Sequence, residues 1–331
     1  MATYLIRRLA WMIPTLFFVA LITFVLMHAA PGGPWDRDLE ARQVDKTTQE
    51  LLSKRFGLDK PLFFNTQGGN PLDSQFFNYI WGALHGDLGP SYRQRGLDVQ
   101  DILFKAPEGK PFWDSKFGYS LRLGLLATAM AALLGIPLGI LGALRRNTFI
   151  DYFSLFISTI GVSVPNFVVA IFFIIIFASK LHLVKIVQQS WNSPGAWLMP
   201  AAILGFGTFA VITRMTRSSL LEVMQQDYIR TARAKGLHER VVVLRHMLRN
   251  ALIPVITILG PALAGLVVGS FIIEQMLGFP GSGRAFVLSI QQRDYSMIMG
   301  TVLLYAVLIA VANLSVDLVY GFLDPRIKVG D

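Results

Sequence analysis

Ten residues in the second half of the chain have the composition and spacing of a contact helix. The run Asp227-Tyr-Ile-Arg-Thr-Ala-Arg-Ala-Lys-Gly236 is short and cationic, and it lies between two stretches apolar enough for a lipid bilayer. Asp227 is a good N-cap, Ala, Arg and Lys favour helix, and Gly236 suits the left-handed residue that ends one. Because Ala232 and Ala234 have little side-chain bulk, another protein could approach this backbone closely. The run therefore predicts a helix that docks on a partner.

The charge of this region has two simpler explanations. A second basic run follows at 237–250, and residues 214–249 hold eight basic against three acidic side chains. Cytoplasmic loops of membrane proteins are generally rich in Lys and Arg. Basic residues can also hold anionic lipid, at about 1 kcal/mol each near the surface. Charge alone thus leaves the topology and lipid interpretations open beside protein docking.

The sequence offers no catalytic or metal site. The chain has no Cys, which excludes disulfides, thiol catalysis and thiolate metal ligands. It contains no Gly-x-x-x-x-Gly-Lys-Ser/Thr loop for phosphate, and the glycine-rich run 278–286 lacks the Lys-Ser/Thr ending of such a loop. A His-Glu-x-x-His motif, a Ser–His pair within the spans and paired intramembrane aspartates are missing too. Any ATP used with this protein must be hydrolysed by another chain.

Hydropathy predicts an all-α membrane protein. Hydrophobic residues make up 53% of the 331 residues and charged residues only 15%, which is unlike an ordinary soluble protein. A helix needs about 20 apolar residues to cross a hydrocarbon core. Six charge-free stretches reach about that length and predict six transmembrane helices: 9–35, 123–144, 152–179, 186–213, 250–273 and 295–316.

The distribution of charge predicts the orientation. The segment 36–118 has eleven basic and twelve acidic residues, so it is close to neutral, whereas the basic excess lies in the 214–249 block and near the ends of the chain. The positive-inside rule then puts both termini in the cytoplasm and the long segment outside. The net charge of +9 is explained by topology, and no nucleic-acid binding is expected. The first apolar run exceeds the 7–15 residues of a signal peptide, which favours an uncleaved helix.

The predicted organisation has two parts. Residues 1–118 comprise the first helix and the external segment, which is too long for a plain turn and should carry its own structure. Its aromatic run from Phe76 to Leu84 predicts a helix that stops at Gly86. Residues 119–331 form a five-helix core with a cytoplasmic loop at 214–250. Gly135-x-x-x-Gly139 and Gly265-x-x-x-Gly269 predict close helix contacts in this core.

Four polar or helix-breaking residues fall in or near the spans. Pro165 lies near the middle of the third span and should bend it, and Asn166 beside it needs a partner in lipid. These two could line a translocation path, or Asn166 could make a helix–helix hydrogen bond. Asp317, at the inner end of the last span, is interpreted as half of a structural ion pair. Glu274 is expected at the outer membrane interface.

Several runs in order resemble one family. Arg230-Thr-Ala-Arg-Ala-Lys-Gly-Leu237, with Arg245-His-Met-Leu-Arg-Asn-Ala-Leu-Ile-Pro254, is similar to the cytoplasmic loop motif of ABC-importer permeases in its oligopeptide and dipeptide version. Arg230-Thr231 stands where Glu-Ala is usual in the broader family, and Leu248-Arg249 where Leu-Pro is usual; both departures are typical of the peptide branch. Further similarities extend essentially from end to end: Tyr4-Leu-Ile-Arg-Arg8, Ala30-Pro-Gly-Gly-Pro34, Gly86-Asp-Leu-Gly-Pro-Ser-Tyr92, Asp98-Val-Gln-Asp-Ile102 and Asp324-Pro-Arg326.

This resemblance implies a type I ABC importer permease fold in the plasma (inner) membrane. It implies a coupling helix that docks on an ATPase, made of Asp227, Tyr228, Arg230, Thr231, Ala232, Arg233, Ala234, Lys235, Gly236 and Leu237. It also implies a scoop at the outer mouth of the path, made of Gly278, Pro280, Gly281 and Gly283.

The same resemblance implies the partners and the cargo. The partners would be a second permease subunit in a heterodimer, two cytoplasmic ATPases that bind ATP and Mg²⁺, an external peptide-binding protein and membrane lipid. Oligopeptide is the expected cargo, and dipeptides, nickel or glutathione are the alternatives within the family. A secondary transporter would need internal repeats and ionisable residues at the membrane midplane, where Asp317 and Glu274 are poorly placed.

Overall fold

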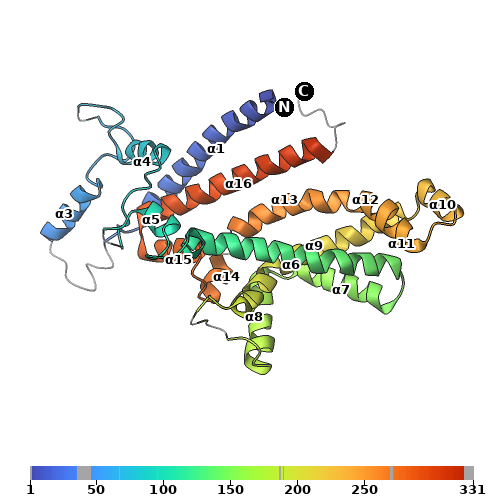
Figure 1. Cartoon of the computed structure of the whole chain (residues 1–331). Coiled ribbons are helices and arrows are strands. Elements are labelled where there is room, and N and C mark those ends of the chain that lie inside the picture. The colour runs from blue at the N-terminus through green and yellow to red at the C-terminus, as the bar shows by residue number, and fades with distance from the viewer. Residues whose placement is uncertain are drawn as a thin grey trace. The chain divides into compact units, whose positions relative to one another are not determined.

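The computed structural model is helical almost throughout (Figure 1). It describes residues 2–35, 46–66, 68–94, 96–185, 188, 190–268 and 271–323. Within these ranges the only extended pairing is an isolated antiparallel bridge between Pro90 and Asp98. The predicted all-α class is confirmed for this part of the chain.

Four helices of the described chain are long and apolar enough to cross a membrane. They are α1 (Ala2–Ala29), α6 (Lys116–Leu144), α9 (Pro194–Val223) and α16 (Tyr295–Leu323). The number rises to six when each of two bent helix pairs is taken as one span. The six predicted spans are therefore found, but two of them are broken.

The break in the third predicted span lies at Pro165. Helix α7 (Phe149–Ser163) ends before it, and α8 (Asn166–Phe173) continues into the π-helix η2 (Ile174–Lys180) at 117° to α7. Proline has no N–H to donate, and it pushes the preceding residue out of the helical region. Val164 accordingly has an extended backbone, with φ −94° and ψ 125°. The proline ends one helix and begins another, which is a sharper change than the predicted bend.

The chain forms two compact units, and the first combines the segment after α1 with α15 (Ser282–Gln292) and the start of α16. Its smaller helices are α3 (Lys46–Arg55), α4 (Gln75–Leu84), α5 (Val99–Phe104) and the 3₁₀ turn η1 (Phe112–Asp114). The predicted aromatic helix is α4, whose buried Phe76 packs with Phe24 of α1 and Met299 of α16. Val99 and Leu103 of α5 form a second core with α15. The segment predicted to be external thus has its own hydrophobic cores.

In the second unit, helices pack closely through glycines. A Cβ on Gly139 of α6 would lie 2.6 Å from the Thr213 carbonyl oxygen of α9, and a Cβ on Gly205 of α9 would lie 2.6 Å from that of Ala127. These distances confirm the close contact predicted for the Gly135–Gly139 pair. Nothing lies within 4 Å of a Cβ on Gly265, and Gly269 is outside the described residues.

The second unit also contains the elements of the basic block. After α9 come α10 (Asp227–Ala234), α11 (Glu239–Val241), the π-helix η3 (Val242–Met247) and α12 (Leu248–Ala251). The second bent pair follows, because α13 (Ile253–Val268) lies at 51° to the 239–251 helix. Helix α14 (Phe271–Met276) and the part of α16 from Val311 onward also belong to this unit. Figure 1 shows α10 and α11 at one end of the helices α6, α7, α9 and α13, with α8 and α14 at the other.

Candidate functional site

Helix α10 begins one residue earlier than the capping pattern predicts. Its N-cap is Gln226, with an extended backbone and no capping side-chain hydrogen bond, and Asp227 is the first helical residue. The prediction that Asp227 caps the helix is therefore wrong. A carboxylate in the first turn still interacts favourably with the helix dipole, so Asp227 supports the start of the helix through its charge.

The end of α10 matches the prediction for Gly236. Its φ is +73°, in the left-handed region that glycine adopts without penalty. The Gly236 N–H donates to the Arg233 carbonyl at 2.9 Å, and the Leu237 N–H donates to the Ala232 carbonyl at 3.4 Å. This pair of hydrogen bonds is a Schellman motif, which satisfies carbonyl groups that a helix end leaves unpaired.

One face of α10 anchors the helix on its own chain. Ile229 is fully buried and Ala232 is 6% exposed. Their spacing of three residues puts them on the same side of the helix, and burial of the isoleucine side chain contributes about 1.5–3 kcal/mol. Both pack in a cluster with residues of α6, α9, η3 and α12: Ala143, Leu220, Val223, Val242, Val243, Met247 and Ala251. The prediction that Ala232 lies open to a partner is wrong, because its small size serves this internal contact.

The other face of α10 is exposed and mostly polar. Arg230, Thr231, Ala234 and Lys235 lie on this surface, together with Asp227. The Arg230–Asp227 pair is 3.6 Å apart and well exposed, and a pair of that kind contributes little to stability. The surface therefore offers positive charge and one small side chain, and Tyr228 and Leu237 are exposed beside it.

Two side-chain contacts hold the flanks of this surface. Arg233 donates to both carboxylate oxygens of Glu239, at 2.7 and 3.2 Å, which closes the turn after α10. This hydrogen bond holds the pKa of the Arg233 guanidinium above its usual value. At the other end, Asn250 Nδ2 donates to Tyr228 Oη at 2.8 Å. Helix α10 is thus tied to both α11 and α12.

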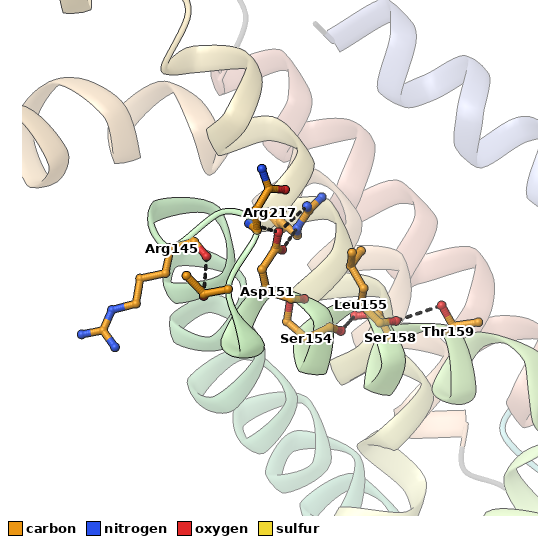
Figure 2. Close-up of polar contacts among 9 residues, drawn as sticks. Arg145, Asp151, Ser154, Leu155, Ser158, Thr159 and Arg217 are labelled. Carbon is orange, nitrogen blue, oxygen red and sulfur yellow. Dashed lines mark hydrogen bonds and ion pairs between the residues drawn. The ribbon is translucent and has the colours of Figure 1, made fainter.

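A buried ion pair secures α9, the helix that leads into α10. Figure 2 shows Asp151 of α7 and Arg217 of α9 pointing toward each other. Arg217 Nε and Nη2 lie 2.5 and 3.1 Å from the two Asp151 carboxylate oxygens, and the Asn147 N–H also donates to this carboxylate, at 2.9 Å. The Asp151 side chain is only 2% exposed. Removing one partner from a buried pair leaves an uncompensated charge and costs about 3–5 kcal/mol, so this contact fixes the α6–α7 turn against α9.

Sequence reasoning missed this pair. Asp151 and Arg217 are 66 residues apart in the chain. Asp151 lies at the edge of an apolar run, and Arg217 stands among residues counted as part of the basic block. No local pattern joins two charges on different helices.

The two residues considered for a translocation path lie at the α7–α8 break. Pro165 is exposed and Asn166 is half-buried. The Asn166 amide oxygen would be 3.3 Å from a Cβ on Gly207 of α9. Its side chain makes no hydrogen bond with any residue that the structure describes. The expected helix–helix hydrogen bond is therefore not found in the described chain, and path lining stays a prediction.

The run predicted as an outer scoop contains a turn and a short helix. Gly278, just after α14, has φ +62°, and Phe279 is fully buried with its ring 4.6 Å from that of Trp191. Gly281 is the N-cap of α15, and Gly283 is buried within that helix. The role of this turn and helix as a scoop stays a prediction.

Of the two acidic residues singled out, Glu274 makes a buried helix–helix contact. It is 1% exposed and accepts a hydrogen bond from Ser120 Oγ at 2.9 Å. Its place at the outer membrane interface stays a prediction. The Asp317 side chain lies outside the described part of the structure. Among the described residues, no group of three or more His, Asp or Glu side chains could hold a metal ion.

Comparison with known proteins gives full-length relatives. The crystal structure of an amino acid ABC transporter with histidines aligns at a TM-score of 0.46 and 16% identity, over 63% of this chain and 90% of that one. The dipeptide transport system permease protein of Bacillus subtilis (strain 168) is 41% identical over 99% of both chains. The oligopeptide transport system permease protein of Escherichia coli (strain K12) is 34% identical over 99% of this chain and all of that one.

A family model covers most of the helical core. The model described as "Binding-protein-dependent transport system inner membrane component" matches residues 135–329, which include α7 to α16 and the whole basic block. With relatives of this identity along the full length, the chain belongs to the family of inner-membrane components of binding-protein-dependent transport systems.

Proposed function

We propose that this chain is a permease subunit of an ATP-driven peptide importer and forms half of its translocation path. The observation that carries the proposal is the full-length similarity to permeases named for oligopeptide and dipeptide transport. Oligopeptide is the cargo that we propose first, in line with the sequence motifs. Dipeptide is the second candidate, because the dipeptide permease of Bacillus subtilis shares more of its residues with this chain.

The energy for import would come from partner subunits. The chain lacks a Gly-Lys-Ser/Thr phosphate loop, so two cytoplasmic ATPases would bind ATP and Mg²⁺. The exposed face of α10, with Arg230, Ala234 and Lys235, would dock on one of them. A partner shifts a conformational equilibrium only through different contacts with its two states. The open and closed ATPase dimers would therefore have to contact α10 differently.

The buried face of α10 would transmit this movement. Ile229 and Ala232 join α10 to side chains of α6 and α9, and the Asp151–Arg217 pair joins α9 to α7. A displacement of α10 would thus act on a packed group of helices, because such a core is not continuously deformable. Pro165 and Asn166, at the α7–α8 break, are proposed to line the path that these helices open.

The remaining assembly follows from the same proposal. Both termini and α10 would lie in the cytoplasm, and the segment between α1 and α6 would lie outside. A second, non-identical permease would complete the path. An external peptide-binding protein would deliver peptide near the turn formed by Gly278, Pro280, Gly281 and Gly283.

Reconstitution tests this function. The chain is purified with its co-encoded partners, placed in proteoliposomes and supplied with binding protein and labelled di-, tri- and pentapeptides. We expect peptide uptake that requires ATP, with the length preference deciding between dipeptide and oligopeptide. The chain purified alone should hydrolyse no ATP. Hydrolysis by the isolated chain that is lost on mutating its own residues, or a complete complex that imports no peptide, would contradict the proposal.

A further inference from the structure

A pocket with a mixed polar and apolar lining lies in the first unit, beside α15. Its volume is about 520 Å³, and it is formed by α15, the first residue of α6 and the loop around Arg93. Ligand pockets for small molecules commonly measure about 300–1,000 Å³. Three of its side chains, Gln94, Gln291 and Gln292, are amides, which both donate and accept hydrogen bonds. The pocket thus has the size and the polarity for a short peptide.

One cation in this pocket, Lys116, has no counter-ion among the residues that the structure describes. Lys116 is half-buried, and its ammonium makes no hydrogen bond or ion pair with any residue of the described chain. Arg284 of α15 acts on it as a like charge. A partly desolvated cation beside a like charge is unfavourable, and an anion at this place would relieve both effects.

The one carboxylate in the pocket wall is already used. Asp294 is 3% exposed and accepts hydrogen bonds from Ser91 Oγ at 2.5 Å and from the backbone N–H groups of Tyr92, Arg93 and Met297 at 3.1–3.4 Å. These hydrogen bonds join residues 91–93 to the start of α16, so Asp294 shapes the loop.

Arg93 is also held in a fixed position. Its Nε donates to the Gln292 carbonyl at 2.6 Å, and its Nη2 donates to the Pro34 carbonyl at 2.8 Å. These bonds join the loop to the end of α15 and to the chain that leaves α1. This part of the pocket wall is thus organised before any ligand arrives, which lowers the entropy cost of binding.

We propose that this pocket is a subsite for the C-terminal carboxylate of the transported peptide, with Lys116 as its counter-ion. The side-chain amides of Gln94, Gln291 and Gln292 would pair with the peptide's own N–H and C=O groups. The proposal rests on the function and orientation proposed above, because it needs a peptide that arrives from the side of this unit. It assigns Lys116 a role in recognising cargo that is separate from the coupling helix.

Transport of two matched peptides tests this subsite. The complete importer is assayed in proteoliposomes with one tripeptide that has a free C-terminal carboxylate and with the same tripeptide as its C-terminal amide. A hydrogen bond between charged groups is worth about 1.5–3 kcal/mol, so Lys116→Gln should raise KM for the free peptide about tenfold or more. Its kcat, and its KM for the amide, should match those of the wild type. Lys116→Arg keeps the charge and should largely restore the free-peptide KM.

The matched control is Lys110→Gln. Lys110 is exposed, lies in the same segment and is not part of the pocket. This substitution therefore removes one positive charge and leaves the subsite unchanged. It should behave like wild type with both peptides. Because the same binding protein is used throughout, its own preference for a carboxylate cancels when variant and wild type are compared.

Each other outcome has a distinct meaning. If Lys116→Gln imports both peptides like wild type, or weakens both equally, the subsite is disproved; equal weakening would indicate that Lys116 contacts the binding protein or supports the fold. If the wild-type complex imports neither peptide, the peptide-import function itself fails and the subsite fails with it. Normal transport of the amide by the variant shows that the variant protein is folded.

Discussion

Two alanines of the same short helix have opposite environments. Ala232 is packed in an internal cluster, whereas Ala234 is exposed. Residues two apart on an α-helix point about 200° apart, so only one of them can face a partner while the other faces the protein. The contact surface proposed for the ATPase thus includes Ala234 and the basic side chains around it. Ala232 lies on the opposite side of the helix and packs against the rest of the protein.

Paired substitutions at these alanines separate docking from folding. We expect Ala232→Asp to lower the stability of the purified chain by several kcal/mol, because it buries an unpaired charge. Ala234→Asp should leave thermal unfolding in detergent unchanged and reduce ATPase co-purification and peptide uptake. Equal unfolding temperatures for both variants would contradict the assigned faces of α10. Normal ATPase binding by Ala234→Asp would contradict docking through this face.

Helix α10 depends on its surroundings more than on its own sequence. It has only eight residues, and isolated helices of that length are marginal in water. Burial of Ile229 on one side and the Schellman motif at Gly236 therefore set its position and its end. The α7–α8 break has the same kind of local cause, because Pro165 stops a helix that the apolar residues around it would otherwise continue.

Substitution of Gly236 tests how the end of α10 is maintained. A Cβ at this position would meet nothing within 4 Å, so the cost is conformational and not steric. Gly236→Val should destabilise the turn by about 1–2 kcal/mol, because a β-branched residue disfavours positive φ. The expected result is faster amide exchange at Leu237 and weaker ATPase co-purification. Gly236→Asn, which tolerates this conformation, is the control; equal effects of both variants would show that φ is not the cause.

At the scale of the whole molecule, the pocket of Lys116 and the exposed face of α10 belong to two different compact units. One contains the helices of the segment between α1 and α6 together with α15, and the other contains α10 and the helices beneath it. The near-neutral segment and the basic block thus belong to different units. Orientation is the assumption on which docking and peptide entry both depend.

Cysteine labelling checks this orientation without background, because the chain has no native Cys. Single substitutions Lys110→Cys and Lys235→Cys replace exposed side chains in the two regions. In intact cells a membrane-impermeant maleimide should label only Lys110→Cys, and Lys235→Cys should react after permeabilisation. The reverse pattern would overturn the orientation and the ATPase contact together. Gln67 is also expected outside and Lys328 inside, and neither is among the residues that the structure describes.

The sequence by itself determined the features that local chemistry controls. Apolar stretches of membrane-spanning length indicated the class of protein, Gly236 marked a helix end and Pro165 marked a distorted span, because each effect acts on the backbone beside the residue. Ordered motifs along the chain identified the family. Even the opposite faces of Ala232 and Ala234 follow from helix geometry, although the pattern did not indicate which face is buried.

Only the tertiary structure decided which distant groups meet. The Asp151–Arg217 pair, the burial of Glu274 against Ser120 and the hydrogen bonds from residues 91–93 to Asp294 all join segments far apart in the chain. That Lys116 has no counter-ion among the described residues is visible for the same reason, because the groups that line its pocket come from distant parts of the chain. Such contacts depend on helix packing in three dimensions, and residue order does not encode them locally.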